Sequence, residues 1–198
     1  MTESANTWTV DEVIAIPEDG RRHELVDGVH HVNGVPVTRA EFAGLDRADT
    51  PSPSLDHQHA VGRLAIALAN FCDEHSVGLA MIGPADLRLT PDSLVGPDVF
   101  VSPKLRGRVP HEWEDIKELR LVIEVLSPNS ARLDRVHKRR LYQRAAVPEY
   151  WIVDADARVV ERWRPTDQRP EVVSEQIDWH PADVSHPLVI DLESLLTR

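Results

Sequence analysis

The feature that most constrains this chain is a short run of apolar residues, 121–126, with one acidic residue inside it. The run reads Leu-Val-Ile-Glu-Val-Leu, and Glu124 is its only charged side chain. A strand this apolar is typical of the centre of a sheet that is covered on both faces. Because a buried carboxylate is costly unless it is paired or binds a cation, Glu124 must find a partner in the folded protein.

Patterns on both sides of this run predict a mixed α/β fold in which helices flank a central sheet. Asp27-Gly28 is typical of the turn of a β-hairpin, and Thr9 with Glu12 has the pattern of a helix-capping box. Periodicity predicts the remaining elements: helices at 60–72 and 131–145, strands at 79–82, 86–89, 99–101, 150–153, 158–163 and 172–177, and a helix or strand at 188–196. With no linker or internal repeat, all 198 residues are expected to form a single domain.

Composition narrows the class of protein. The formal net charge of −11 argues against a protein that coats nucleic acid non-specifically, but it is compatible with an enzyme that has a local basic patch. The single cysteine, Cys72, cannot form an internal disulfide. The N-terminus does not resemble a secretory signal, and no apolar run approaches the roughly 20 residues of a membrane helix. We therefore expect a soluble, cytoplasmic protein that does not enter membranes.

A second acidic residue lies in a setting like that of Glu124. Asp98 follows a proline and directly precedes the predicted strand at 99–101. If this strand is next to 121–126, both carboxylates can project from one end of the sheet. Two or three carboxylates suffice for Mg²⁺, which would polarise a phosphoryl oxygen and activate a bound water. In the alternative, Asp98 caps a turn and Glu124 pairs with a buried arginine.

The predicted helix at 131–145 adds a cation to these acids. Lys138 lies at the edge of the apolar side of this helix, where it could stabilise the charge of a phosphate in the transition state. The alternative is a simple Asp134–Lys138 pair, which would contribute only about 0.3–0.5 kcal/mol.

Other cations are candidates for contacts with the phosphates of a nucleic acid. They are Arg135 and Arg139 of the same helix, and Lys104, Arg106 and Arg108 of the preceding loop. In the alternative, which is about equally common, such a run of charged residues is only a solvent-exposed surface that binds no nucleic acid. The histidines and the cysteine have no zinc-site spacing, and the glycines form no phosphate-binding loop.

Several motifs, taken in order, resemble the Uma-two family of restriction-endonuclease-like proteins, part of the PD-(D/E)XK nuclease-like superfamily. The motifs are His-Glu-Leu-Val-Asp-Gly at 23–28, Gly-Pro-Asp-Val at 96–99, Ile-Glu-Val-Leu-Ser-Pro-Asn-Ser at 123–130, Asp-Arg at 134–135 with Lys138, and Val-Pro-Glu-Tyr-Trp-Ile-Val-Asp at 147–154. The resemblance covers about residues 9–164, and residues 165–198 are less diagnostic.

The resemblance implies a restriction-endonuclease-like mixed sheet between helices and Mg²⁺-dependent (or Mn²⁺-dependent) hydrolysis of DNA. It implies that Asp98 and Glu124 are metal ligands and that Glu24 is a third acid that supports the metal or its water. The superfamily lysine normally comes two residues after the second acid, where this chain has Leu126. Lys138 would take its place, because a flexible lysine side chain can reach the metal from the next helix.

His57 also falls where the family carries a histidine, and we interpret it as a structural cap at the start of a helix. The preferred hypothesis is thus a metal-dependent endodeoxyribonuclease, and a homodimer would suit cleavage of both strands. The alternative is a catalytically inactive nuclease-like domain that binds DNA or a protein partner. A hydrolase of small phosphate esters is a third hypothesis, which the missing phosphate loop disfavours.

Overall fold

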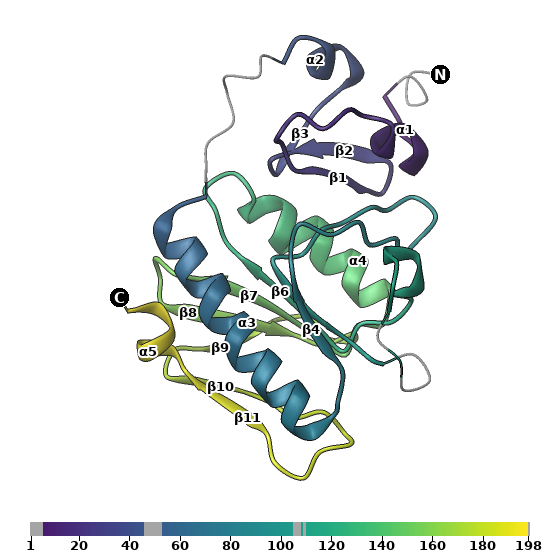
Figure 1. The fold of residues 1–198 in the computed structure, drawn as a ribbon. Coiled ribbons are helices and arrows are strands. Elements are labelled where there is room, and N and C mark those ends of the chain that lie inside the picture. Colours follow the sequence, from purple (N-terminus) through teal and green to yellow (C-terminus); the bar gives the residue numbers. More distant parts are fainter. Residues whose placement is uncertain (1–5, 46–52, 105–107, 109, 198) are drawn as a thin grey trace.

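A six-stranded mixed sheet forms the centre of the protein (Figure 1). The structure is a computed structural model that describes residues 6–45, 53–104, 108 and 110–197. The strand order is β4-β5-β6-β7-β8-β9; β6 and β7 are parallel, and the other neighbours are antiparallel. The strands are β4 (Leu79–Ile82), β5 (Val99–Ser102), β6 (Leu121–Val125), β7 (Glu149–Asp154), β8 (Val159–Trp163) and β9 (Glu171–Val173). The prediction of a mixed central sheet is confirmed.

Two small antiparallel sheets and several helices complete the fold (Figure 1). The small sheets consist of β1 (His23–Val26), β2 (Val29–Val32) and β3 (Val35–Pro36), and of β10 (Gln176–Trp179) and β11 (Leu188–Asp191). The α-helices are α1 (Val10–Ile14), α2 (Arg39–Ala43), α3 (Leu55–His75), α4 (Arg139–Arg144) and α5 (Leu192–Leu196). A 3₁₀ turn, η2 (Trp113–Asp115), and a π-helical segment, η3 (Leu133–Lys138), are also present. Among the described residues, no helix is both long and apolar enough to cross a bilayer.

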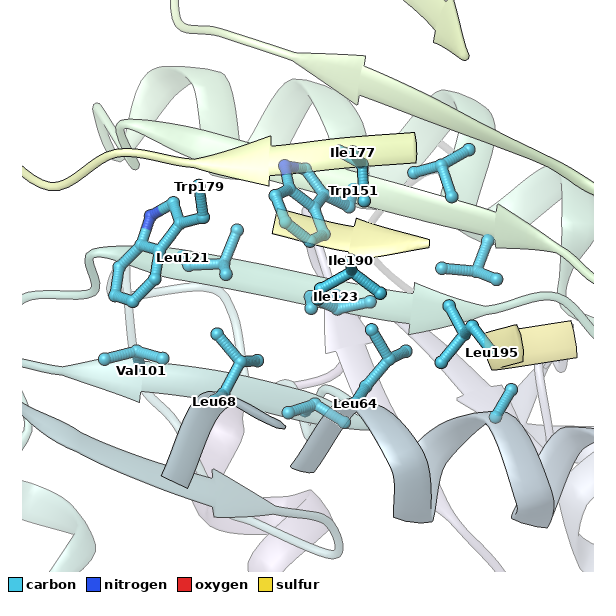
Figure 2. Close-up of a cluster of buried hydrophobic side chains, with 14 of the residues drawn as sticks. Leu64, Leu68, Val101, Leu121, Ile123, Trp151, Ile177, Trp179, Ile190 and Leu195 are labelled. Carbon is cyan, nitrogen blue, oxygen red and sulfur yellow. The ribbon is translucent and has the colours of Figure 1, made fainter. Parts of the chain in front are cut away.

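β6 is buried along its whole length, as its apolar sequence predicts. Its odd-numbered residues, Leu121 and Ile123, belong to the core between the central sheet and α3, where Leu64 and Leu68 point toward them (Figure 2). Val122 instead packs in the core on the opposite face, with residues of η3 and α4. The alternation of side chains along the strand therefore directs Glu124 to the side of the helical segment that carries Lys138.

Several parts of the chain differ from the predicted elements, and three of them are segments where a strand was predicted or considered. Residues 86–89 are not a strand, because β4 and β5 pair directly and leave this segment in their connection. Of these four residues only Leu87 forms a β-bridge, and its partner is Val95 of the same connection. The predicted strand at 172–177 divides into β9 and β10, which belong to different sheets. Residues 188–196, predicted as either a helix or a strand, form one after the other: strand β11 is followed directly by helix α5, with Asp191 as its N-cap.

Candidate active site

The four residues predicted from the sequence lie together at one end of the central sheet. Glu24 comes from β1, Asp98 from the residue just before β5, Glu124 from β6 and Lys138 from the end of η3. Antiparallel pairing of β5 with β6 places the start of one strand beside the end of the other. All four side chains are buried, although they come from distant parts of the chain.

Lys138 joins two of these acids. Its Nζ lies 2.6 Å from Glu24 Oε1 and donates a hydrogen bond of 2.8 Å to Glu124 Oε1. Asp134 Oδ1 is 3.6 Å away, so the predicted Asp134–Lys138 pair is the longest of the three contacts. The π-helical geometry of η3 buries both Asp134 and Lys138, and such segments are frequent at functional sites. Tyr142 of α4 donates a further hydrogen bond to Glu124 Oε1.

Arg22, which no sequence motif indicated, contacts all three predicted metal ligands. Its Nη1 is 3.0 Å from Asp98 Oδ1, its Nη2 is 3.2 Å from Glu124 Oε2 and its Nε is 3.4 Å from Glu24 Oε2. Nη2 also donates to the carbonyl oxygen of Gly96. Glu124 thus pairs with an arginine, as the alternative hypothesis expected, but the side chain of this arginine is partly exposed and not buried.

The second oxygen of Asp98 has its own partners. The backbone N–H of Val125 donates to Asp98 Oδ2 at 2.8 Å, and His57 Nε2 lies 3.3 Å from the same oxygen. The interpretation of His57 as a cap is wrong, because Ser54 is the N-cap of α3 and accepts the backbone N–H of His57. The position of His57 in the first turn leaves its side chain free to face the acids, and only the family resemblance signalled it.

The charges of this group do not balance. We call Glu24, Asp98, Glu124 and Asp134 the four-acid cluster; its permanently charged partners are Arg22 and Lys138. With every group ionised, four negative charges face two positive ones. A divalent cation would reduce this excess of negative charge.

The pKa values reflect this imbalance. Burial raises the pKa of Glu124 to about 8, although the charges of Lys138 and Arg22 act in the opposite direction. Burial also tends to raise the pKa of Asp98, but the charge of Arg22 and the contacts with His57 and Val125 outweigh it and lower this pKa to about 2. Burial alone would lower the pKa of Lys138, but Glu124 and Glu24 raise it, so the ammonium stays charged.

The donor chemistry of the cluster fits magnesium. One oxygen each from Glu24, Asp98 and Glu124, with the carbonyl of Gly96, faces the same guanidinium. Carboxylate and carbonyl oxygens are the ligand types that Mg²⁺ and Mn²⁺ prefer. Within the ranges that the structure describes, however, no three His, Cys, Asp or Glu side chains are arranged as a ready metal site.

The predicted DNA-contacting cations are placed differently from one another. Arg135 pairs with Asp154 and Glu161 at 2.9 and 2.7 Å. Arg139 lies over the ring of Trp163, with its guanidinium carbon 4.8 Å from the ring centre. Lys104 is partly exposed, Arg108 is exposed, and Arg106 lies outside the described residues.

Comparison with known proteins gives a family and a fold. A family model named Uma2 and described as "Putative restriction endonuclease" matches residues 47–195. The match includes the C-terminal residues that appeared less diagnostic, and it leaves Glu24 and Arg22 outside. No curated protein matches the chain.

A solved structure is similar to nearly the whole chain. It is described as a putative nuclease belonging to DUF820 from Anabaena variabilis ATCC 29413. The TM-score is 0.67 at 22% sequence identity, over 96% of this chain and 97% of the other. This likeness supports the fold, including the N-terminal part that carries Glu24. From the family match over residues 47–195, the chain belongs to the Uma2 family, as its sequence motifs indicated.

Proposed function

We propose that this protein is a metal-dependent endodeoxyribonuclease that hydrolyses phosphodiester bonds in DNA. The observation that carries the proposal is the convergence of Glu24, Asp98 and Glu124, each with one oxygen directed at the same cation. Ordinary structural ion pairs do not require three buried acids from separate segments, because each buried acid costs desolvation free energy. Membership in a family described as "Putative restriction endonuclease" supports the same reaction class.

In this proposal, Asp98 and Glu124 are the main metal ligands and Glu24 supports them. A bound Mg²⁺ or Mn²⁺ would supply Lewis acidity and a water of lowered pKa. Lys138 orients Glu24 and Glu124 through its two short contacts and adds positive charge where the phosphate charge develops. Since Lys138 is only 1% exposed, a direct contact with substrate requires the cluster to open.

Supercoiled plasmid cleavage tests the assignment. We expect Asp98→Asn and Glu124→Gln each to lower Mg²⁺- or Mn²⁺-dependent cleavage by at least about 100-fold, because each removes a ligand charge. The exposed Asp156→Asn serves as a matched control and should cleave like the wild type. Circular dichroism checks that the variants stay folded. Unchanged cleavage by both folded cluster variants would overturn the assignment.

One observation favours a second candidate, a catalytically inactive domain that binds DNA or a protein partner. In the described part of the chain, the predicted ligands are held by Arg22 and Lys138 rather than arranged around a metal site. This candidate predicts binding without turnover and no uptake of Mn²⁺. A metal titration beside the plasmid assay separates the two functions.

The proposal extends to partners and to the limits of the domain. DNA is the proposed substrate, with phosphate contacts from Lys104, Arg135 and Arg139, and a homodimer would cut both strands. We further propose that residues 1–198 act as one nuclease-like domain, and that the protein works in the cytoplasm.

A further inference from the structure

The guanidinium of Arg22 lies at the meeting point of four oxygens. These are Glu24 Oε2, Asp98 Oδ1, Glu124 Oε2 and the carbonyl oxygen of Gly96. The second oxygen of each acid is occupied elsewhere. Lys138 contacts Glu24 Oε1 and Glu124 Oε1, while the Val125 N–H and His57 hold Asp98 Oδ2. Each acid therefore offers one oriented oxygen to the position that Arg22 fills.

The two cations of the cluster differ in their access to solvent. The side chain of Arg22 is 33% exposed, whereas that of Lys138 is 1% exposed. Arg22 is held through its backbone, since its N–H donates to Asn33 Oδ1 and its carbonyl accepts from the Asn33 N–H. A turn of this partly exposed side chain toward solvent would not require these backbone contacts to break. The buried side chain of Lys138 has no comparable access to solvent.

We propose that Arg22 is a displaceable internal cation that fills the divalent-metal position, and that metal binding requires its guanidinium to leave. The inference rests on the proposed function, and it adds a residue that controls access to the site. Without metal, Arg22 compensates the charge of three acids that would otherwise repel one another. With metal, the same three oxygens and the Gly96 carbonyl become ligands, while Lys138 and the Val125 N–H keep the acids oriented.

The physical consequence is competition between two cations for one set of oxygens. Metal affinity is reduced by the free energy needed to remove Arg22 from its contacts. Replacement of Arg22 by a neutral side chain abolishes this competition. Among the described residues, it also leaves Lys138 as the only permanent positive charge beside the three acids until a metal binds.

Isothermal titration of the full-length protein with Mn²⁺ tests this inference. We expect Arg22→Gln to bind Mn²⁺ at least about tenfold more tightly than the wild type, because charge-assisted hydrogen bonds no longer compete. Arg162→Gln is the matched control, since Arg162 also contacts three carboxylates, Glu149, Glu171 and Asp178, away from the cluster. Its Mn²⁺ affinity should equal that of the wild type.

Thermal unfolding gives a second readout that does not depend on catalysis. In EDTA, Arg22→Gln should melt below the wild type, and saturating Mn²⁺ should raise its melting temperature by more than that of the wild type. If Arg22→Gln does not fold in EDTA, Arg22→Lys replaces it, because one ammonium cannot span three carboxylates as a guanidinium does. Its Mn²⁺ affinity should then lie above that of the wild type. Adding Asp98→Asn to either variant should reverse the gain.

The outcomes separate this inference from the proposed function. If the wild type binds Mn²⁺ and folded Arg22 variants bind it no more tightly, the inference is wrong and the metal-dependent function stands. If Mn²⁺ binds neither the wild type nor the Arg22 variants, both are wrong. An equal gain in Mn²⁺ affinity in Arg162→Gln would also overturn the inference. It would mean that any group of acids that loses its arginine binds the metal.

Discussion

Glu124 is a buried acid whose position in a strand decides which partners it can have. Because strand side chains alternate, Val122 and Glu124 share the face toward η3 and α4, while Leu121 and Ile123 face α3. A shift of one residue in pairing register would place the carboxylate in the apolar core beneath α3. The hydrophobic pattern of β6 therefore fixes the direction in which Glu124 points.

Removal of the lysine beside Glu124 should strongly destabilise the protein. Lys138→Met leaves Glu24, Glu124 and Asp134 buried without their shared cation, which we expect to lower the free energy of unfolding by about 3–5 kcal/mol. Urea denaturation at pH 7 measures the loss. The exposed Lys117→Met is the control and should stay within about 0.5 kcal/mol of the wild type. A loss below about 1 kcal/mol would show that Lys138 does not stabilise the buried acids of the folded protein.

At the scale of elements, α3 connects the core to the site. It starts at the Ser54 cap, ends at Ser76 with a left-handed φ of 55°, and presents Leu64 and Leu68 to the central sheet (Figure 2). The first turn of the same helix brings His57 to Asp98. Packing of the apolar side of α3 thus positions a polar residue at the site.

Two substitutions on α3 distinguish its buried and exposed sides. Leu68→Ala creates a cavity at a fully buried position and should cost about 2–5 kcal/mol of unfolding free energy. Ile66→Ala removes a side chain that is 60% exposed and should change this free energy by less than about 0.5 kcal/mol. Chemical denaturation measures both. Equal losses for the two variants would contradict the packing of α3 on the central sheet.

At the scale of the whole molecule, the net charge of −11 opposes the approach of DNA. Binding of DNA, as proposed above, would therefore depend on local cations, and two of the three proposed contacts already have partners within the protein. Arg135 and Arg139 already have intramolecular partners, whereas Lys104 is partly exposed. The proposed contacts are thus expected to give weak, strongly salt-dependent binding.

Fluorescence anisotropy of a short duplex with Glu124→Gln, which we expect to block cleavage, measures this dependence. Three phosphate contacts predict a slope of about −3 for log K against log salt. Lys104→Gln should weaken binding to all sequences and reduce the slope by about 1. The exposed Lys117→Gln should leave both unchanged. A slope near zero would rule out these cations as phosphate contacts.

Much of the fold follows from local sequence patterns. The hairpin turn at Asp27-Gly28 forms as predicted, with both residues at positive φ, and the capping box of Thr9 and Glu12 is present. These features depend on residues a few positions apart, so the sequence displays them directly. The segment at 172–177 could not be predicted correctly, because its two halves pair with strands of different sheets.

The sequence by itself determined that Glu124 and Asp98 need partners, because carboxylates beside apolar strands lose hydration when the chain folds. Only the tertiary structure decided which partners they have. Arg21 and Arg22 are adjacent, yet Arg21 pairs with nearby Asp19 while Arg22 reaches Asp98 and Glu124. That choice depends on how β1 is held against the end of the central sheet, through contacts between residues far apart in the chain. Local sequence patterns do not predict such long-range contacts, so the pairing of charges at the site depends on the tertiary structure.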